Sequence, residues 1–281
     1  MFPAGRPELR TRYLELASGL HVRAVESGSH GAPRIVMFPG WACSAYVFRE
    51  NLAPLAAAGF HVLAIELKGH GLSDKPRSPE EYRLEPMRRH VIDILDALAG
   101  DPPMLAGLSI GAALAAHVAE SDPHRVRAVA MVSPVGFSGV PGLSVFKALT
   151  PSPVTPFLPR LATRPVIDLI LRTVNGRLRQ ITPRDVDEYW APTQFPEFPR
   201  AMRHLLHEFS WRAPFPRLKV PCMLISGSRD RFLSRSVVRS FCETLPSMRH
   251  IEVPDAGHVV YDEAAPVVNI AMTEFFRGAV R

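Results

Sequence analysis

Positions 107–111 read Gly107-Leu108-Ser109-Ile110-Gly111, between the short apolar run 103–106 and the small-residue run 112–119. This order predicts a buried strand, a five-residue turn and a helix. Glycine on both sides of Ser109 removes the Cβ atoms that would collide where a strand reverses sharply into a helix. The turn is therefore predicted to hold the Ser109 hydroxyl at a helix N-terminus, where backbone N–H groups and the helix dipole stabilise developing negative charge.

Two interpretations of this turn are open. The pattern G-x-S-x-G is typical of a nucleophilic serine when a strand precedes it and a helix follows it. The same residues also fit a surface serine between two glycines that serve only packing. The apolar run before Ser109 and the alanine-rich segment after it favour the nucleophile.

Length and composition restrict the class of protein. The chain has 281 residues, of which 47% are hydrophobic and 21% charged. This supports one large α/β domain or two small ones with a sizeable core, and it is the composition of a folded protein. The formal net charge is +6, but the arginines are scattered and form no long basic run. Nucleic-acid binding is therefore not expected, whereas an anionic substrate or an acidic protein partner stays open.

The cysteines and the N-terminal segment bear on location. Cys43, Cys222 and Cys242 have no C-x-x-C spacing and cannot all pair, so we expect buried or partly buried thiols in a reducing compartment. Residues 1–12 carry charges and prolines without the apolar stretch of a signal peptide, and no run of 18 apolar residues occurs. These features predict a cytoplasmic protein without a membrane span.

Strand and helix patterns alternate along most of the chain. Segments 10–17 and 20–27 alternate polar and apolar residues around a Ser-Gly pair, which predicts a hairpin of two edge strands. Further strands are predicted at 34–38, 60–66, 103–107, 126–132, 221–226 and 249–253, and helices at 44–58, 82–99, 112–119, 234–244 and from about Glu263. The alternation implies an α/β fold with a mostly parallel twisted sheet and helices on both faces.

The alternation stops between residues 136 and 212. Prolines cut this segment into short helical pieces without clear strands, and the segment is rich in aromatic residues. We interpret it as a helical cap over a pocket. An irregular helical layer without a gating role is the alternative. The predicted organisation is thus a first core segment at 1–135, a cap at 136–212 and a second core segment at 213–281.

A nucleophilic serine needs partners, because its hydroxyl is weak without a neighbouring base that a carboxylate orients. In a parallel sheet these partners lie on loops after later strands, in the order serine, acid, histidine. Asp230 and His258 each follow a predicted late strand, in that order. They are the candidates for acid and base.

Other titratable residues near the C-terminus fit different roles. Asp255 competes with Asp230, but it lies only three residues from His258 on the same loop. His250 falls inside a predicted strand and is expected to point into a layer rather than a cleft. Asp262 and Glu263 are placed in the first turn of the final helix, where negative charge suits the dipole.

The oxyanion of an acyl-transfer reaction needs two preorganised N–H donors. One is predicted to be the amide of Ile110, at the start of the helix. The other is the backbone N–H of Trp41, on the loop after strand 34–38, since the proline earlier in that loop has no N–H to donate. The substrate pocket is expected to include Trp190, Phe137 and Val259.

Four separated motifs together resemble the α/β-hydrolase fold superfamily, in particular its capped serine esterase-like branch. They lie at 38–41 (Phe-Pro-Gly-Trp), 68–74 (Lys-Gly-His-Gly-Leu-Ser-Asp), 107–111 and 257–258 (Gly-His). The resemblance runs from about residue 12 to the final helix and weakens in the cap. It implies that Ser109 is the nucleophile, His258 the base and Asp230 the orienting acid, with Trp41 and Ile110 as oxyanion donors.

The sequence departs from the family pattern at two points. Pro39-Gly40 stands where the family often has His-Gly, and Glu66 stands where it often has aspartate. The first change leaves the backbone donor in place but bears on the shape of the loop. In this family His70 would be structural rather than catalytic.

The resemblance implies hydrolysis of a carboxylic ester through an acyl-enzyme. The sequence has no evident metal-ligand constellation or phosphate-binding loop, so no cofactor is expected. A serine in place of an aspartate at the turn argues against the haloalkane dehalogenase and epoxide hydrolase branches. Carbon–carbon bond hydrolases, lactonases, thioesterases and esterases acting on carrier-bound acyl chains are alternatives, the last with an acidic carrier protein as partner. A non-catalytic binding protein of the same fold is a further alternative, although such proteins usually lack one triad member.

Overall fold

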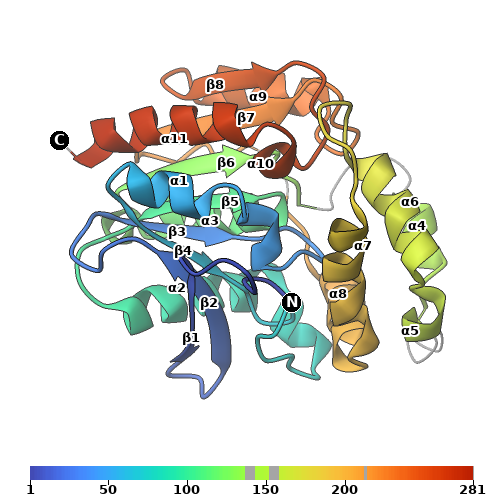
Figure 1. The fold of residues 1–281 in the computed structure, drawn as a ribbon. Helices are drawn as coiled ribbons and strands as arrows, with labels where there is room; N and C mark the ends of the chain where they lie inside the picture. Colours follow the sequence, from blue (N-terminus) through green and yellow to red (C-terminus); the bar gives the residue numbers. More distant parts are fainter. Residues whose placement is uncertain (137–142, 152–157, 212–213, 281) are drawn as a thin grey trace.

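A computed structural model describes residues 1–136, 143–151, 158–211 and 214–280. Its centre is one eight-stranded sheet in the order β1-β2-β4-β3-β5-β6-β7-β8 (Figure 1). β1 and β2 pair antiparallel, β2 pairs antiparallel with β4, and the remaining neighbours are parallel. The strands are β1 (Arg10–Glu15), β2 (His21–Ser27), β3 (Arg34–Phe38), β4 (His61–Ile65), β5 (Met104–Leu108), β6 (Ala128–Val132), β7 (Cys222–Gly227) and β8 (Arg249–Val253).

Helices cover both faces of the sheet, as the alternating pattern predicts (Figure 1). Apolar side chains of α2 (Leu84–Leu98), α3 (Ile110–Ser121) and α9 (Arg235–Thr244) belong to one core cluster. Those of α1 (Leu52–Ala57), α10 (Val260–Glu263) and α11 (Ala265–Val280) belong to the other. Because β3 to β7 lie inside the sheet, their side chains are buried on both faces, which explains their continuous apolar runs.

One predicted helix is divided and another is preceded by an extra turn. The segment 44–58 forms a 3₁₀ turn, η1 (Ala45–Phe48), and then α1. The last helix, expected from about Glu263, begins at Ala265 as α11, and the short α10 precedes it. Pro54 and Pro266 lie in the first turns of α1 and α11. Proline has no N–H for a helical hydrogen bond, so a helix can begin there but cannot run through. The hairpin is present, but β2 lies between β1 and β4 and is not an edge strand.

Between β6 and β7 the described chain is helical. We call residues 136–212 the cap. It contains α4 (Leu143–Ala148), α5 (Leu158–Leu161), α6 (Arg164–Val174), α7 (Pro183–Trp190), η5 (Ala191–Gln194) and α8 (Glu197–Glu208). These helices lie beyond the carboxyl ends of the parallel strands (Figure 1). The remaining 3₁₀ turns are η2 (Pro79–Tyr82) and η3 (Pro123–Arg125). No helix of the described residues is long and apolar enough to cross a membrane.

Candidate active site

Ser109 lies in a strained turn between β5 and α3. Its backbone angles are φ 55° and ψ −120°, a region that non-glycine residues rarely occupy and that costs about 1–3 kcal/mol. A Cβ atom at Gly107 would collide with the backbone of Gly111, and one at Gly111 would collide with the Phe38 carbonyl oxygen. The two glycines therefore allow β3, β5 and α3 to pack closely enough to maintain this turn. The structure thus confirms the strand, turn and helix expected around Ser109.

Asp230 and His258 form a hydrogen-bonded pair. Asp230 follows β7, His258 follows β8, and His258 Nδ1 is 2.9 Å from Asp230 Oδ2. The other carboxylate oxygen accepts the backbone N–H groups of Phe232 at 2.8 Å and Leu233 at 3.0 Å. Burial alone would raise the pKa of Asp230, but His258 and the two N–H donors hold it below its ordinary value. An ionised Asp230 accepts a hydrogen bond from a proton on Nδ1, which favours the His258 tautomer whose lone pair is on Nε2.

Ser109 and this pair lie at the same edge of the sheet. β5, β6, β7 and β8 are successive neighbours and parallel, so the loops that follow them leave the sheet on one side. The Ser109 N–H donates to the carbonyl of Val132 at the end of β6, 3.0 Å away. Both Ser109 and the Asp230 side chain are almost fully buried. This edge is where open parallel sheets place their ligands.

The competing residues lie elsewhere. The Asp255 carboxylate is exposed and accepts from Arg229 Nε at 2.7 Å. His250 Nε2 is 3.0 Å from Ser226 Oγ, inside the β7–β8 pair. His70 is fully buried, with Nδ1 3.3 Å from the Lys68 carbonyl oxygen, and burial lowers its pKa to about 4. A neutral, enclosed His70 agrees with a structural role.

The loop after β3 runs against Ser109. A Cβ atom at Gly40 would be 3.2 Å from Ser109 Cβ, so the absence of a side chain there lets the two backbones approach. The next residue, Trp41, is fixed by its indole N–H, which donates to the Met202 carbonyl of α8 at 2.8 Å. Ile110 is fully buried at the start of α3. Both proposed oxyanion donors thus flank Ser109 in the chain or in space.

The expected pocket residues have mixed outcomes. Phe137 lies outside the described residues. Val259 is buried directly after His258. The Trp190 ring is half-buried, and the Arg164 guanidinium carbon lies 3.7 Å from its centroid. Arg164 therefore covers one face of the ring, and a substrate contact of Trp190 stays a prediction.

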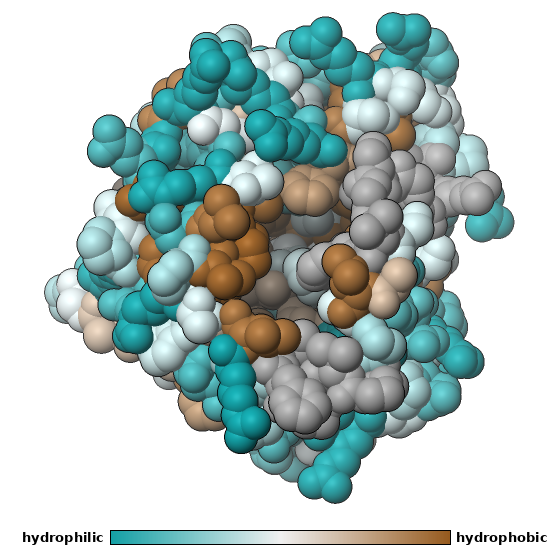
Figure 2. Space-filling model, turned by 90° about the vertical axis from the view of Figure 1, so that its right-hand side faces the viewer, coloured by the Kyte–Doolittle hydropathy of each residue, from teal (hydrophilic) through white to brown (hydrophobic). Residues whose placement is uncertain are grey.

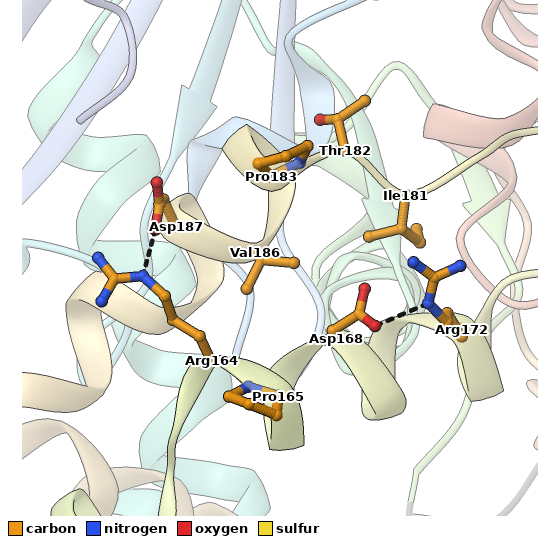
Figure 3. Close-up of a pocket in the computed structure, with 9 residues that line it drawn as sticks. All are labelled: Arg164, Pro165, Asp168, Arg172, Ile181, Thr182, Pro183, Val186 and Asp187. Atoms are coloured by element: carbon orange, nitrogen blue, oxygen red, sulfur yellow. Dashed lines mark hydrogen bonds and ion pairs between the residues drawn. The ribbon is translucent and has the colours of Figure 1, made fainter.

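A separate groove of about 390 Å³ lies between α6 and α7 (Figure 3). It is bordered by two ion pairs, Arg164–Asp187 at 2.6 Å and Arg172–Asp168 at 2.7 Å. All nine lining residues belong to the cap, and neither Ser109, Asp230 nor His258 is among them. This groove is therefore distinct from the candidate catalytic residues.

One group of metal-ligand type occurs within the described ranges, formed by Glu26, His30 and His61. It lies near the end of β2 and the start of β4, away from Ser109. Glu26 Oε2 already accepts from Arg12 Nε at 3.1 Å and lies 3.1 Å from His61 Nε2. Burial lowers the pKa of His61, and Arg34 adds positive charge nearby. A cation would compete with these arginines, so the group has the character of a structural ion-pair cluster.

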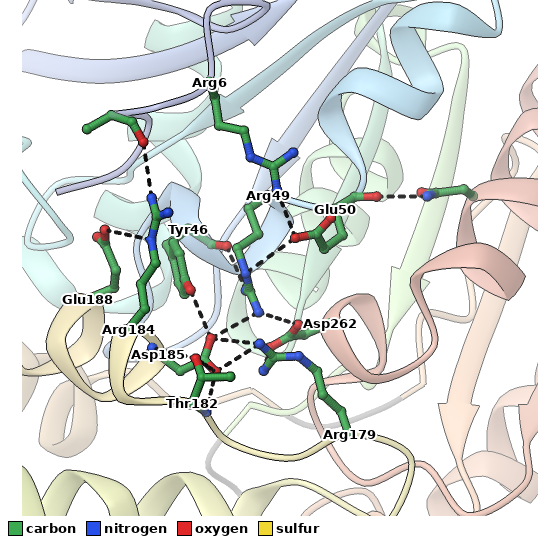
Figure 4. Close-up of polar contacts among 12 residues, drawn as sticks. Arg6, Tyr46, Arg49, Glu50, Arg179, Thr182, Arg184, Asp185, Glu188 and Asp262 are labelled. Atoms are coloured by element: carbon green, nitrogen blue, oxygen red, sulfur yellow. Dashed lines mark hydrogen bonds and ion pairs between the residues drawn. The ribbon is translucent and has the colours of Figure 1, made fainter.

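The sequence reasoning did not anticipate a buried ion network between the core and the cap (Figure 4). Arg49 Nη2 lies 3.1 Å from Asp185 of α7 and 2.5 Å from Asp262 of α10. Arg179 pairs with the same two carboxylates, at 2.8 Å and 3.0 Å. Tyr46 also donates its hydroxyl to Asp185, at 2.8 Å. Tyr46 and Arg49 are more than a hundred residues away from Asp185 and Asp262 in the chain, so no local pattern could reveal these contacts.

Two further acidic residues differ from expectation. Asp262 and Glu263 do not open the last long helix but end the short α10, and both are buried with specific partners.

Glu66, in place of the more usual aspartate, is fully buried. Its carboxylate accepts from the N–H groups of Ala45 at 3.0 Å and Leu72 at 2.7 Å and from Arg23 at 2.9 Å. It thus joins the two loops that follow β3 and β4.

Known proteins resemble the chain over nearly its full length. The AB hydrolase superfamily protein YfhM of Bacillus subtilis is 25% identical, with 92% of this chain and 96% of the relative covered. Epoxide hydrolase A of Mycobacterium tuberculosis is 24% identical, with 95% and 98% covered. A solved serine hydrolase involved in carbazole degradation superimposes with a TM-score of 0.81 at 18% identity, covering 96% and 99% of the two chains. The model of the alpha/beta hydrolase family matches residues 35–270. The chain therefore belongs to the alpha/beta hydrolase family.

Proposed function

We propose that this hydrolase cleaves carboxylic esters, or closely related acyl bonds, through an acyl-enzyme. The observation that carries the proposal is the Asp230–His258 hydrogen bond, on the sheet edge where Ser109 occupies its strained turn. A serine, a histidine whose Nδ1 is paired with an aspartate, and that ionised aspartate can serve as nucleophile, base and orienting acid. Here Ser109 is the proposed nucleophile, His258 the base and Asp230 the orienting acid.

In the first half-reaction, Ser109 Oγ attacks the ester carbonyl carbon while His258 Nε2 takes the hydroxyl proton. Asp230 stabilises the resulting imidazolium through Nδ1 and stays ionised. The carbonyl oxygen becomes an oxyanion, and the backbone N–H groups of Trp41 and Ile110 are proposed to bind it. Collapse of the intermediate breaks the bond to the alcohol oxygen, which leaves with the proton from His258. The acyl group then remains on Ser109.

In the second half-reaction, water attacks the acyl-enzyme and His258 takes its proton. A second tetrahedral intermediate forms and collapses with Ser109 Oγ as the leaving group. His258 returns the proton to that oxygen, which restores the enzyme and releases the carboxylic acid. Atoms and charge balance with one water consumed for each ester cleaved.

The nucleophile distinguishes esters from epoxides as substrates. Several of the similar proteins are named epoxide hydrolases. If Ser109 opened an epoxide, the product would be an ether on the serine, and water does not cleave an ether readily. With an ester, lactone or thioester, Ser109 forms an ester that water can hydrolyse. Carbon–carbon bond hydrolysis and carrier-bound acyl chains use the same residues, so substrate panels must separate them.

We further propose that residues 136–212 act as a cap that receives an apolar acyl chain. The face formed by the cap is hollowed, and hydrophobic residues gather around the hollow (Figure 2). Several large apolar side chains of the described cap are also exposed: Leu149, Leu161, Val166, Leu169, Ile170, Leu178 and Phe195. An apolar rim favours apolar substrates, because it removes their surface from water. The core segments 1–135 and 213–281 would then supply the chemistry.

The test compares Ser109→Ala with Ser133→Ala. Ser133 lies at the end of neighbouring β6, is fully buried, also has a positive φ, and has no hydrogen-bond partner for its hydroxyl among the described residues. Hydrolysis of p-nitrophenyl esters should fall by about 10⁴-fold or more in Ser109→Ala, because only binding and the oxyanion hole remain. Ser133→Ala should keep wild-type turnover. A folded Ser109→Ala variant within tenfold of wild type would refute the proposal.

A further inference from the structure

A segment of the cap is pressed against the loop that carries His258. We call residues 174–179 the strap and residues 255–258 the base loop. The His258 N–H donates to the Val174 carbonyl at 2.8 Å, and the Arg177 N–H donates to the Asp255 carbonyl at 2.9 Å. A Cβ atom at Gly176 would collide with the backbone of the base loop, and one at Gly257 would collide with the strap. The two backbones thus form one tightly packed unit.

Glu263 holds both segments with a single carboxylate. Its Oε1 accepts the Gly257 N–H at 2.8 Å, and its Oε2 accepts the Gly176 N–H at 2.6 Å. The residue is 7% exposed and lies in α10, which follows the base loop. Burial raises the pKa of Glu263, while the two N–H donors favour its ionised form. Each donor has its own oxygen, so the ionised carboxylate satisfies both donors at once.

The neighbouring acid, Asp262, contacts the strap and the core. Asp262 Oδ2 accepts from Arg179 Nη1 at 3.0 Å, and Oδ1 pairs with Arg49 (Figure 4). These side-chain contacts reach the strap and the core but not the base loop. Asp262 and Glu263 are consecutive and both buried, and they differ in whether they contact the residue before His258. This difference supplies a matched pair of variants.

We propose that Glu263 is a positioning residue that couples the strap of the cap to His258, so that a substrate bound under the cap aligns the base. The proposal rests on the proposed function, because it assigns His258 the role of base. One carboxylate bonded to Gly176 and Gly257 transmits a shift of either segment to the other. Binding of a substrate under the cap and the alignment of His258 are thus linked through the Glu263 side chain.

The test uses Glu263→Gln, Glu263→Asp and Asp262→Asn. Glutamine has one acceptor oxygen, and its NH₂ group faces the second N–H donor. For Glu263→Gln we expect kcat to fall by about 10–100-fold with little change in KM, by analogy with residues that orient the ligands of a metal. The kcat is calculated per active site, and the active sites are titrated with a fluorophosphonate. Glu263→Asp keeps both oxygens and should recover part of this loss. Asp262→Asn should lower the melting temperature while kcat stays within threefold of wild type.

Hydrogen exchange of the amides of Gly176 and Gly257 provides a readout that does not depend on activity. Glu263→Gln should accelerate exchange at both amides. Asp262→Asn leaves both Glu263 hydrogen bonds in place and should change exchange at neither amide. In Glu263→Gln, acceleration of exchange at only one of the two amides, or an unchanged kcat, would overturn the coupling. If the wild type hydrolyses no ester but both amides respond together, the mechanical link stands and the proposed reaction fails. The two claims are therefore separable.

Discussion

Ser109, the proposed nucleophile, is buried and has a backbone conformation that only its surroundings can maintain. The turn depends on Gly107 and Gly111, whose Cβ atoms would have no space. Such local requirements are visible in a sequence, because glycine at fixed offsets around a serine has one steric explanation. Asp230 and His258 could also be proposed from the sequence, because each follows a recognisable strand. Sequence spacing could not establish that the substrate pocket includes Phe137, Trp190 and Val259, because the contacts of a pocket depend on tertiary packing.

Replacing the acid distinguishes the two aspartates near His258. In Asp230→Asn the amide no longer selects the Nδ1–H tautomer, so kcat/KM for an ester should fall by roughly 10⁴-fold, as for the analogous change in a known triad. Asp255→Asn removes only an exposed ion pair with Arg229 and should leave kcat/KM near wild type. Steady-state kinetics of both variants decide the assignment. A dead Asp255→Asn enzyme beside an active Asp230→Asn enzyme would reverse it.

At the scale of elements, the strands were predicted more closely than the helices. The run of apolar residues in β3 is buried and has sharp ends, and its predicted and observed bounds coincide. The bounds of the partly exposed edge strand β8 also coincide with the prediction. Helix ends depend on caps and prolines, and the predicted helix 44–58 is divided before α1, whose first turn holds Pro54. The attachment of α7 to the core through Asp185 depends on residues distant in sequence. No short pattern encodes such a contact.

Asp185→Asn tests this attachment. The carboxylate is fully buried against Arg49 and Arg179, and breaking a buried ion pair typically costs about 3–5 kcal/mol in free energy of unfolding. Burial would raise the pKa of Asp185, but Arg179, Thr182 and Tyr46 lower it from 3.8 to about 2. Because the folded pKa is depressed, its stabilisation is complete above 3.8 and is lost as pH falls toward 2.

Chemical denaturation at pH 7 and pH 5 measures the effect of Asp185→Asn. Since both values lie above 3.8, the loss of stability should be the same at the two pH values. Asp187→Asn is the control, because its ion pair with Arg164 is exposed and should contribute little. Equal stability of Asp185→Asn and Asp187→Asn would show that the network does not hold α7.

At the scale of the whole molecule, buried neutral histidines make stability depend on pH. Burial lowers the pKa of His70 from 6.5 to about 4. Below pH 6.5 the unfolded chain binds a proton at this residue that the folded chain does not, so the folded state loses stability as pH falls toward 4. Between pH 7 and pH 5 this residue alone should cost about 2 kcal/mol.

Denaturation curves of wild type and His70→Gln at these two pH values test the effect. The variant cannot titrate at this position, so its stability should decline less between pH 7 and pH 5, whatever its absolute stability. His117, whose pKa burial also lowers to about 4, remains in both proteins and accounts for part of the residual decline. An identical decline in the two proteins would mean that His70 binds its proton equally in both states.

The apolar cap predicts selectivity along a series of acyl chains. Each buried CH₂ contributes about 0.8 kcal/mol, so two or three added methylenes should raise kcat/KM by roughly ten- to fiftyfold until the pocket is filled. We expect a preference for about C4 to C8 over acetate on this basis. Trp190→Ala should flatten the slope more than it changes turnover of the acetate ester. An unchanged slope would remove Trp190 from the acyl site.

The central claim is that Ser109 carries the acyl group. Its most direct test is peptide mapping by mass spectrometry after reaction of the protein with a fluorophosphonate, which traps a serine activated by a base. We predict one label per chain, on the peptide that contains Ser109, and much slower labelling in a folded Asp230→Asn variant. A label on another residue, or no label on a folded wild-type protein, would contradict the account.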